Sequence, residues 1–300
     1  MTHCPRRYRT RLWNRRGTDP FLLTTLEFPA VREFSEDYLR RTREGMWDDS
    51  REALEALSLE SHDRILDVGC GTGELSRVLR TEAARGATLV GCDVDTDLLE
   101  VAADRGADSS SFVAGNALEL PFPDDTFDLV VCQALLINLP DPTAALAEFA
   151  RVSRDLVAAV EPNNADVSID SSVPAEDSLE RRARRAYLAG VSTDVALGAD
   201  AREAFAAAGL EVCRTRRYDH VRTVEPPYSE GALLAARRKA TGAGLADDRE
   251  TLLSGPLTEP EYDELRGAWR EMGRTVVEQM DDRAYRRSES VPFYVTVGRV

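Results

Sequence analysis

The stretch Ile65–Glu74, with the sequence ILDVGCGTGE, decides the fold. It opens with an apolar run that contains one acid, Asp67, and ends with Gly69, Gly71 and Gly73 in alternate positions. The run lacks polar alternation, which predicts a strand buried on both faces. Glycines between such a strand and a helix let a ligand lie against the main chain, because glycine has no Cβ and adopts positive φ. The N-terminus of the helix adds free N–H groups for an anion.

Strand and helix patterns alternate beyond this stretch. Strands are expected at 64–68, 87–93, 110–116, 127–133, 156–162, 210–219 and 291–300, and helices at 74–84, 95–105, 142–152 and 201–210. Alternation at this spacing implies right-handed crossovers between parallel strands. The predicted fold class is therefore α/β, with a Rossmann-like, doubly wound, mostly parallel sheet of seven strands and helical cap segments.

Three segments interrupt the alternation and are interpreted as caps over the sheet. They comprise residues 28–59, 163–198 and 225–288. With them, residues 28–300 are expected to form a single domain whose cofactor-binding core is about 60–162. The charge runs in the two later segments are interpreted as solvated helix faces.

The N-terminal residues 1–27 differ in composition from the rest of the chain. Six arginines lie between Cys4 and Gly17, together with Tyr8 and Trp13, in a chain whose net charge is −15. Arginines with interleaved aromatic residues can form a nucleic-acid-binding arm. A disordered tail, or a start codon assigned too far upstream, is the alternative that we favour, because the acidic balance of the chain opposes binding to phosphates.

Composition excludes several classes of protein. No apolar stretch in the 300 residues approaches the roughly 20 that a membrane helix needs, and no apolar segment of a secretory signal follows the N-terminus. The five cysteines are odd in number and form no CxxC pair, so we expect reduced thiols, no metal site and a cytoplasmic location. Cys70, Cys92 and Cys132 follow neighbouring strands; small buried thiols are favoured over a metal or redox trio.

Asp93 is a candidate ligand-binding acid. It ends the second predicted strand, twenty residues after Gly73. A carboxylate there can accept both hydroxyls of a ribose. It could instead cap the next helix, but Asp95 can serve as that cap, so the ribose role is favoured. The glycines follow G-x-G-x-G, one residue shorter than the usual dinucleotide pattern, which disfavours a nicotinamide oxidoreductase.

Together, four motifs resemble those of class I S-adenosylmethionine-dependent methyltransferases of the broad group that acts mostly on small molecules. They are LDVGCGTG, GCDVD, GNALELPFPDDTFDLVVCQALLINLPDP and VEP, between Ile65 and Pro162. The combination is specific for the cofactor, S-adenosylmethionine, and carries almost no information on the substrate. The match covers about a third of the chain.

The resemblance implies a set of cofactor-binding positions. They are Asp67, Gly69, Cys70, Gly71, Gly73, Asp93, Val94, Asn116, Ala117 and Gln133. By resemblance, Asp67 and the glycine turn would hold the methionine moiety, and Asp93 the ribose. Asn116 and Ala117 would border the adenine, where the family more often has aspartate in place of Asn116; an amide can still pair with the adenine amino group. Gln133 would lie beside the methionine amino group.

The chain departs from the family at the position of a frequent histidine. Ile137 and Asn138 precede the LPDP segment there, so no general base is identified and the catalytic residue is unassigned. Asn138 could orient a substrate or only cap the loop. Tyr38, Arg43 and Trp47 are further candidates for lining the substrate site. Trp47 could face the sulfonium through its π-surface, but a place in the core is slightly favoured.

The predicted function is methyl transfer from S-adenosylmethionine to a small-molecule acceptor by in-line displacement. Nucleic acid and membrane are not expected partners, and the sequence sets no oligomeric state. Two alternatives stay open: a regulatory protein that binds the cofactor without transferring a methyl group, and an RNA methyltransferase that uses the arginine-rich tail of residues 1–27.

Overall fold

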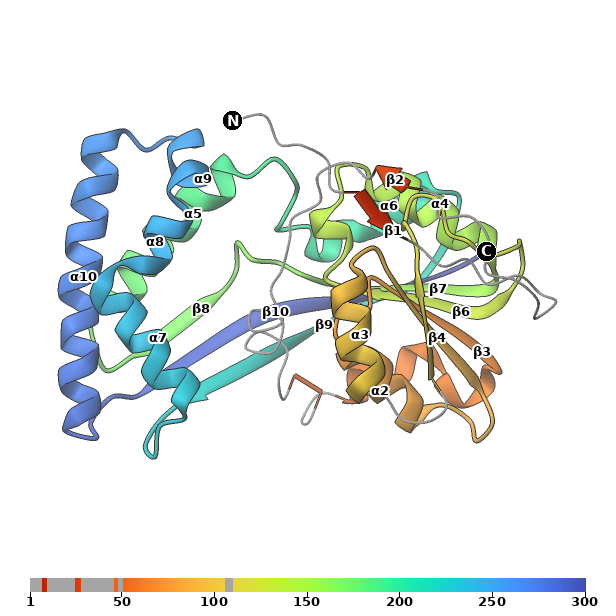
Figure 1. Cartoon of the computed structure of the whole chain (residues 1–300), viewed down its shortest axis with the longest axis horizontal. Coiled ribbons are helices and arrows are strands. Elements are labelled where there is room, and N and C mark those ends of the chain that lie inside the picture. The colour runs from red at the N-terminus through yellow and green to blue at the C-terminus, as the bar shows by residue number, and fades with distance from the viewer. Residues whose placement is uncertain (1–6, 10–24, 28–45, 48–50, 106–109) are drawn as a thin grey trace. The chain divides into compact units, whose positions relative to one another are not determined.

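The computed structural model describes residues 7–9, 25–27, 46–47, 51–105 and 110–300, with its helices and strands labelled in Figure 1. The chain divides into two compact units. Unit 1 comprises residues 1–160, 202–214 and 296–300, and unit 2 comprises residues 161–201 and 215–295.

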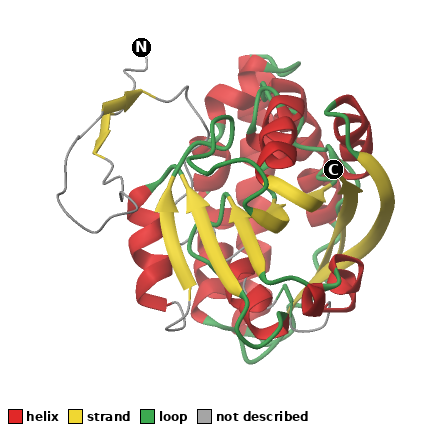
Figure 2. Ribbon diagram, turned by 90° about the vertical axis from the view of Figure 1, so that its right-hand side faces the viewer, coloured by secondary structure: helices red, strands yellow, loops and turns green. Residues whose placement is uncertain are grey.

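A parallel sheet forms the centre of unit 1. Its strand order is β5-β4-β3-β6-β7, and each neighbouring pair is parallel. The strands are β3 (Arg64–Val68), β4 (Thr88–Asp93), β5 (Ser110–Ala114), β6 (Phe127–Gln133) and β7 (Ser153–Pro162). Figure 2 shows neighbouring strands side by side with helices flanking them. The strand order reverses between β3 and β6, which is where open α/β sheets bind their ligands.

Helices connect these strands and cover them. They are α2 (Glu74–Glu82), α3 (Thr96–Arg105), α4 (Pro142–Val152) and α6 (Ala201–Ala207). Asp141 caps α4, since its Oδ1 accepts a hydrogen bond from the Ala144 N–H at 2.9 Å. Every residue of β6 is buried, including Asp128 and Gln133, as expected for a central strand.

The N-terminal part of unit 1 contains a pair of short strands and two 3₁₀ helices. Strands β1 (Arg7–Arg9) and β2 (Thr25–Glu27) pair antiparallel; the rest of the tail predicted to be disordered lies outside the described residues. The helix expected before the first sheet strand is present as two 3₁₀ helices, η1 (Arg51–Leu57) and η2 (Leu59–Ser61). Leu54 and Leu57 of η1 are buried.

Unit 2 is mainly helical. Its helices are η4 (Gly198–Asp200), α5 (Ala175–Gly190), α7 (Glu230–Thr241), α8 (Ala243–Asp247), α9 (Arg249–Ser254) and α10 (Glu259–Asp281). Helices α7 and α10 pack side by side (Figure 1). A first apolar cluster joins Ala236 of α7 to Met272 and Val276 of α10. A second joins Ala183 and Ala186 of α5 to residues of α8, α9 and α10.

Three strands belong wholly or partly to unit 2. Strands β9 (Glu211–Val224) and β10 (Arg287–Arg299) pair with each other, and each begins in one unit and ends in the other. Strand β8 (Ser168–Ser171) pairs antiparallel with β10. The seven strands expected from the sequence are all present, and β8 is an addition that its four polar-rich residues did not predict. The doubly wound, mostly parallel α/β fold is confirmed.

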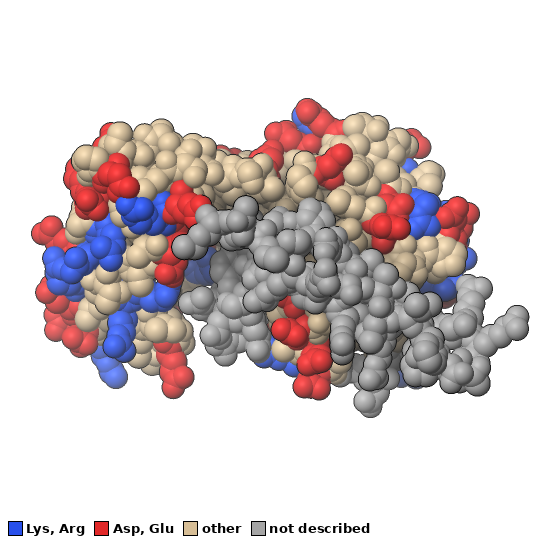
Figure 3. Space-filling model, turned by 45° about the horizontal axis from the view of Figure 1, so that its top comes forward, with Lys and Arg blue, Asp and Glu red and all other residues tan. Residues whose placement is uncertain are grey.

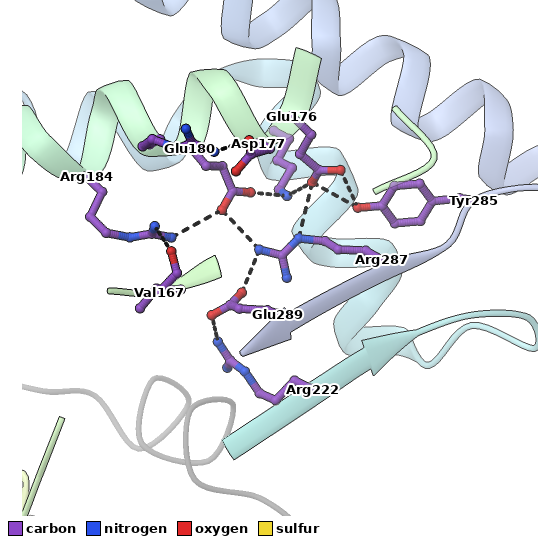
Figure 4. Close-up of polar contacts among 11 residues, drawn as sticks. Val167, Glu176, Asp177, Glu180, Arg184, Arg222, Tyr285, Arg287 and Glu289 are labelled. Carbon is purple, nitrogen blue, oxygen red and sulfur yellow. Dashed lines mark hydrogen bonds and ion pairs between the residues drawn. The ribbon is translucent and has the colours of Figure 1, made fainter. Parts of the chain in front are cut away.

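A cluster of charged residues lies inside unit 2 (Figure 4). This charge cluster consists of Glu176, Glu180, Arg184, Arg222, Lys239, Arg287 and Glu289. Lys239 is the only lysine of the chain, and its Nζ contacts both Glu176 and Glu180. Glu176 is fully buried. The expectation that the charge runs form solvated faces is therefore wrong for α5, because partners distant in sequence converge on one side of this helix.

Candidate cofactor-binding site

The glycine turn after β3 is fixed by hydrogen bonds to the end of β4. The N–H groups of Gly69 and Cys70 both donate to the Cys92 carbonyl, at 2.7 and 3.2 Å, and Gly73 N–H donates to the Cys70 carbonyl at 2.8 Å. Gly69, Gly71 and Gly73 have φ of 69°, 51° and 77°, the left-handed region that glycine adopts readily. Gly73 then serves as the N-cap of α2.

Packing within the protein gives a second reason for the glycines. A Cβ at Gly69 would lie 2.9 Å from Leu135 Cδ1, and a Cβ at Gly73 would lie 3.2 Å from the Cβ of Ala102. These positions lack side chains because neighbouring residues occupy the space, in addition to the backbone conformation that the turn requires.

Asp93 holds the glycine turn through its carboxylate. Its Oδ2 accepts from Gly71 N–H at 2.8 Å, and its Oδ1 from Asp95 N–H at 2.9 Å. Burial raises the pKa of Asp93, and these backbone hydrogen bonds oppose the rise. No arginine or lysine among the described residues forms an ion pair with this carboxylate. Each oxygen can accept a further hydrogen bond, so two hydroxyl donors can bind there.

The capping of α3 falls to Asp95. Its Oδ1 accepts from the N–H groups of Asp97 and Leu98, at 2.9 and 3.2 Å. Asp93 is therefore not needed as the cap of this helix. The ribose role of Asp93 stays a prediction, as does the role of the neighbouring Val94, which is partly exposed.

Asp67 links β3 to α2. It is buried, and its Oδ2 accepts from the Ser76 hydroxyl at 2.6 Å. Strand register brings the predicted residues together, since Val68 lies opposite Cys92 of β4 and Cys132 of β6. Asp67, the glycine turn, Asp93 and Gln133 consequently gather at the carboxyl ends of three adjacent strands.

Gln133 ends β6 and contacts two residues from the N-terminal part of the chain. Its Oε1 accepts from Trp47 Nε1 at 3.2 Å, and its Nε2 lies 2.9 Å from Met46 Sδ. Trp47 is 4% exposed, which agrees with a place in the core. Met46 was not predicted, and no local pattern marks it. Tyr38 and Arg43, the other candidates from this segment, lie outside the described residues.

The segment proposed to border an adenine follows β5. Asn116 Oδ1 accepts from Leu118 N–H at 3.0 Å, and Asn116 and Ala117 are partly exposed. The side-chain oxygen of Asn116 thus shapes its own turn, and the amide NH₂ is the group that remains for a ligand. Gly115 was not predicted; a Cβ there would lie 2.7 Å from Cys92 Sγ.

Asn138 stabilises the loop after β6. It is 5% exposed, and its Nδ2 donates to the Ala134 carbonyl at 2.8 Å. This contact is the loop-capping role that the sequence analysis left open beside substrate orientation. Ala134 has φ of 48°, unusual for a residue with a Cβ.

The three cysteines near the site are buried thiols. Burial raises the pKa of Cys70 and of Cys92, and the negative charges of Asp67 and Asp93 raise both further. Both thiols are therefore neutral at neutral pH, unlike the thiolates that bind metals or act as nucleophiles. Within the described ranges, no three cysteine, histidine or acidic residues are grouped so that they could hold a metal ion.

Two surface properties concern partners. No helix among the described residues has the length and apolarity to cross a membrane. On the face visible in Figure 3, acidic and basic side chains of the described residues are interspersed and do not gather into a basic patch.

Residues 66–156 match the family model described as "Methyltransferase domain". This part of the chain is a methyltransferase domain. The match contains the glycine turn, Asp93, Asn116 and Gln133, the residues that the geometry brings together.

Curated relatives align with about a third of this chain. The demethylmenaquinone methyltransferase of Bacillus licheniformis is 37% identical over 111 residues, 36% of this chain and 45% of that protein. The 2-phytyl-1,4-naphtoquinone methyltransferase of Synechococcus elongatus is 36% identical over 107 residues, 34% of this chain and 46% of that protein. Methyltransferase GfsG of Streptomyces halstedii is 36% identical over 110 residues, 35% of this chain and 39% of that protein. The chain thus spans about half the length of these relatives, or less.

A solved structure resembles more of the chain. It belongs to a complex that contains the Trm112 methyltransferase activator of Haloferax volcanii, with a TM-score of 0.50 and 20% identity over 88% of this chain and 94% of that chain. At this identity the likeness shows the fold alone.

Proposed function

We propose that the protein transfers a methyl group from S-adenosylmethionine to a small-molecule acceptor. The observation that carries the proposal is the Asp93 carboxylate, which is partly buried, accepts from the Gly71 N–H at 2.8 Å and forms no ion pair with the described residues. An acid that is costly to bury and lacks a charge partner is a candidate binding group. The methyltransferase relatives support the same activity.

The residues of unit 1 fit the chemical groups of this cofactor. Asp93 would accept the ribose hydroxyls, and the turn from Gly69 to Gly73 would lie beside the methionine part with the N-terminus of α2 beyond it. Asn116 would present its amide to the adenine, and Gln133 would border the methionine amino group. When bound, the cofactor supplies an electrophilic methyl group on a positively charged sulfur.

Catalysis in this proposal depends on alignment more than on acid or base chemistry. Orientation of nucleophile and methyl group can lower the barrier by about 7–11 kcal/mol. Gln133, Trp47 and Met46 form a buried contact at the end of β6 and would keep water from one side of the site. Asn138, where the family frequently has histidine, is engaged with the Ala134 carbonyl and is not assigned as a base.

The acceptor is proposed to be a small molecule of the cytoplasm. Three buried thiols in unit 1 agree with a reducing compartment, and the net charge of −15 disfavours nucleic acid. Two relatives are named for methylation of quinone precursors, so hydroquinones belong in the first panel of acceptors. The matches cover about a third of this chain, so the panel has to identify the acceptor.

Calorimetric titration and a transfer assay test the proposal. Wild-type protein is expected to bind S-adenosylmethionine and S-adenosylhomocysteine, and Asp93→Ala to weaken both by roughly tenfold to a hundredfold, the effect of losing hydrogen bonds to a charged group. Label from methyl-labelled cofactor should move into an acceptor from a metabolite extract. Binding without transfer to any acceptor would favour the regulatory alternative, and no binding would refute the proposal.

A further inference from the structure

The chain turns sharply directly after the site residue Gln133. Ala134 has φ of 48°, in the left-handed region where its Cβ is disfavoured. Its N–H donates to the Val160 carbonyl of β7 at 2.9 Å, so the turn is attached to the sheet. Backbone conformations of this kind persist only where the surroundings enforce them, and they concentrate at functional sites.

The turn places Leu135 against the glycine loop. Leu135 Cδ1, Cδ2 and Cγ lie 2.9 to 3.2 Å from the position that a Cβ of Gly69 would occupy. Leu135 therefore covers the main chain at the first glycine of the turn. Leu135 directly follows Ala134 in the chain. Any change in the Ala134 conformation would therefore move Leu135 relative to Gly69.

Asn138 holds this arrangement from the far end of the loop. Its Nδ2 donates to the Ala134 carbonyl at 2.8 Å, and its N–H donates to the Leu135 carbonyl at 2.9 Å. The side chain is 5% exposed, so water does not readily replace the Nδ2 hydrogen bond. One residue thus binds the carbonyls of both the strained residue and the residue that covers Gly69.

We infer that Asn138 is a positioning residue for cofactor binding, which acts by keeping Ala134 left-handed and Leu135 on Gly69. This inference rests on the proposed function, since it concerns the affinity of the same site. The role differs from that of a base or a substrate ligand: Asn138 acts through the backbone carbonyl of Ala134. It requires a donor at position 138 and a left-handed residue at position 134.

Titration with S-adenosylhomocysteine and thermal melts of four variants test the inference. Asn138→Ala removes the donor and is expected to weaken binding about tenfold, the equivalent of one buried hydrogen bond. Asn138→Asp offers a carboxylate in place of the donor and should weaken binding at least as much. Asn164→Ala is the matched control, because Asn164 Nδ2 also donates to a backbone carbonyl, that of Val195 in unit 2, at 2.6 Å.

Rescue distinguishes positioning from a general loss of stability. In the double variant Asn138→Ala/Ala134→Gly, glycine adopts the left-handed conformation without help, so part of the lost affinity should return. Asn164→Ala should lower the melting temperature and leave the affinity within twofold of wild type. If Asn138→Ala does not fold, Leu135→Ala replaces it, since it uncovers Gly69 and leaves no polar group unsatisfied.

Each outcome has a definite meaning. Wild-type protein that binds no S-adenosylhomocysteine refutes the proposed function and not merely the role of Asn138. Wild-type binding together with unchanged affinity in Asn138→Ala, or in the substitute Leu135→Ala, overturns the inference alone. A loss that Ala134→Gly does not reduce at all also overturns it, because the strained residue would then be irrelevant.

Discussion

The pKa values of two acids in this chain, Asp93 and Glu289, shift in opposite directions. In unit 1, burial raises the pKa of Asp93, and only backbone N–H groups oppose the rise. In unit 2, burial would also raise the pKa of Glu289, but attraction to Arg222 and Arg287 lowers it to about 2. The charge of Glu289 is balanced by arginines of the protein. Asp93 has no such cation among the described residues, so its carboxylate can bind a ligand instead. This difference separates structural acids from a candidate binding acid.

The charge cluster explains why so many ionic groups can be buried in unit 2. Three carboxylates and four cations alternate there, and each carboxylate contacts at least two partners (Figure 4). Glu176, for example, accepts from Ser171 Oγ at 2.5 Å and from Tyr285 OH at 2.9 Å besides its contact with Lys239. Removing one member would leave its buried partners with fewer opposite charges than they need.

Lys239→Ala should produce the largest effect. Glu176 and Glu180 would lose one of the two cations that they share, with Arg287 remaining, and the free energy of unfolding of unit 2 should fall by about 3–5 kcal/mol. The adjacent Arg238 is the control, because its pair with Asp247 is exposed, and Arg238→Ala should cost less than about 1 kcal/mol. Denaturant unfolding monitored by circular dichroism measures both. Equal effects of the two variants would mean that the buried cluster adds nothing beyond a surface pair.

Lowering the pH should affect cofactor binding by unit 1 and the stability of unit 2 at different pH values. The folded-state pKa of Glu289 lies below its ordinary value of 4.5, so its stabilising contribution is present above pH 4.5 and is lost as pH falls towards 2. The difference between a pKa of 4.5 and one of about 2 corresponds to on the order of 3 kcal/mol. The pKa of Asp93 is raised, so its proton binds more readily in the folded protein, and cofactor affinity should decline at a higher pH than unit 2 unfolds.

Titrations from pH 7 to pH 3, combined with melts at each pH, check this order. Glu289→Gln should flatten the acid dependence of stability, and Asp93→Asn should flatten that of cofactor affinity. Loss of binding and unfolding at one common pH in the wild-type protein would remove the distinction between the two acids.

Gly69→Ala should have a smaller effect, confined to unit 1. Its φ of 69° would cost alanine about 1–2 kcal/mol, and the new Cβ would press on Leu135. Gly267→Ala is the control within α10, where a Cβ meets nothing within 4 Å; there alanine should stabilise the helix by about 0.5–1 kcal/mol. Chemical denaturation should therefore give shifts of opposite sign, and two shifts of the same sign would argue against the packing at Gly69.

The sequence predicted unit 1 better than unit 2, for a physical reason. Strand β6 (Phe127–Gln133) and helix α4 (Pro142–Val152) have the bounds predicted from the sequence. The signals for these bounds are local. The charge cluster depends on contacts between residues far apart in sequence, such as Lys239 and Glu176, which no periodicity reveals. Within the site, the motif residues were predictable, whereas Met46 and the strained Ala134 depend on how loops pack against the sheet.

The central claim is that the Asp93 carboxylate binds the ribose hydroxyls, and a thermodynamic cycle tests it most directly. The four affinities are those of wild-type protein and Asp93→Ala for S-adenosylhomocysteine and for its analogue without the ribose hydroxyls, all measured by calorimetry. We predict that removing the hydroxyls weakens binding to the wild type by roughly tenfold or more and scarcely affects the variant. Equal losses in both proteins would contradict the assignment.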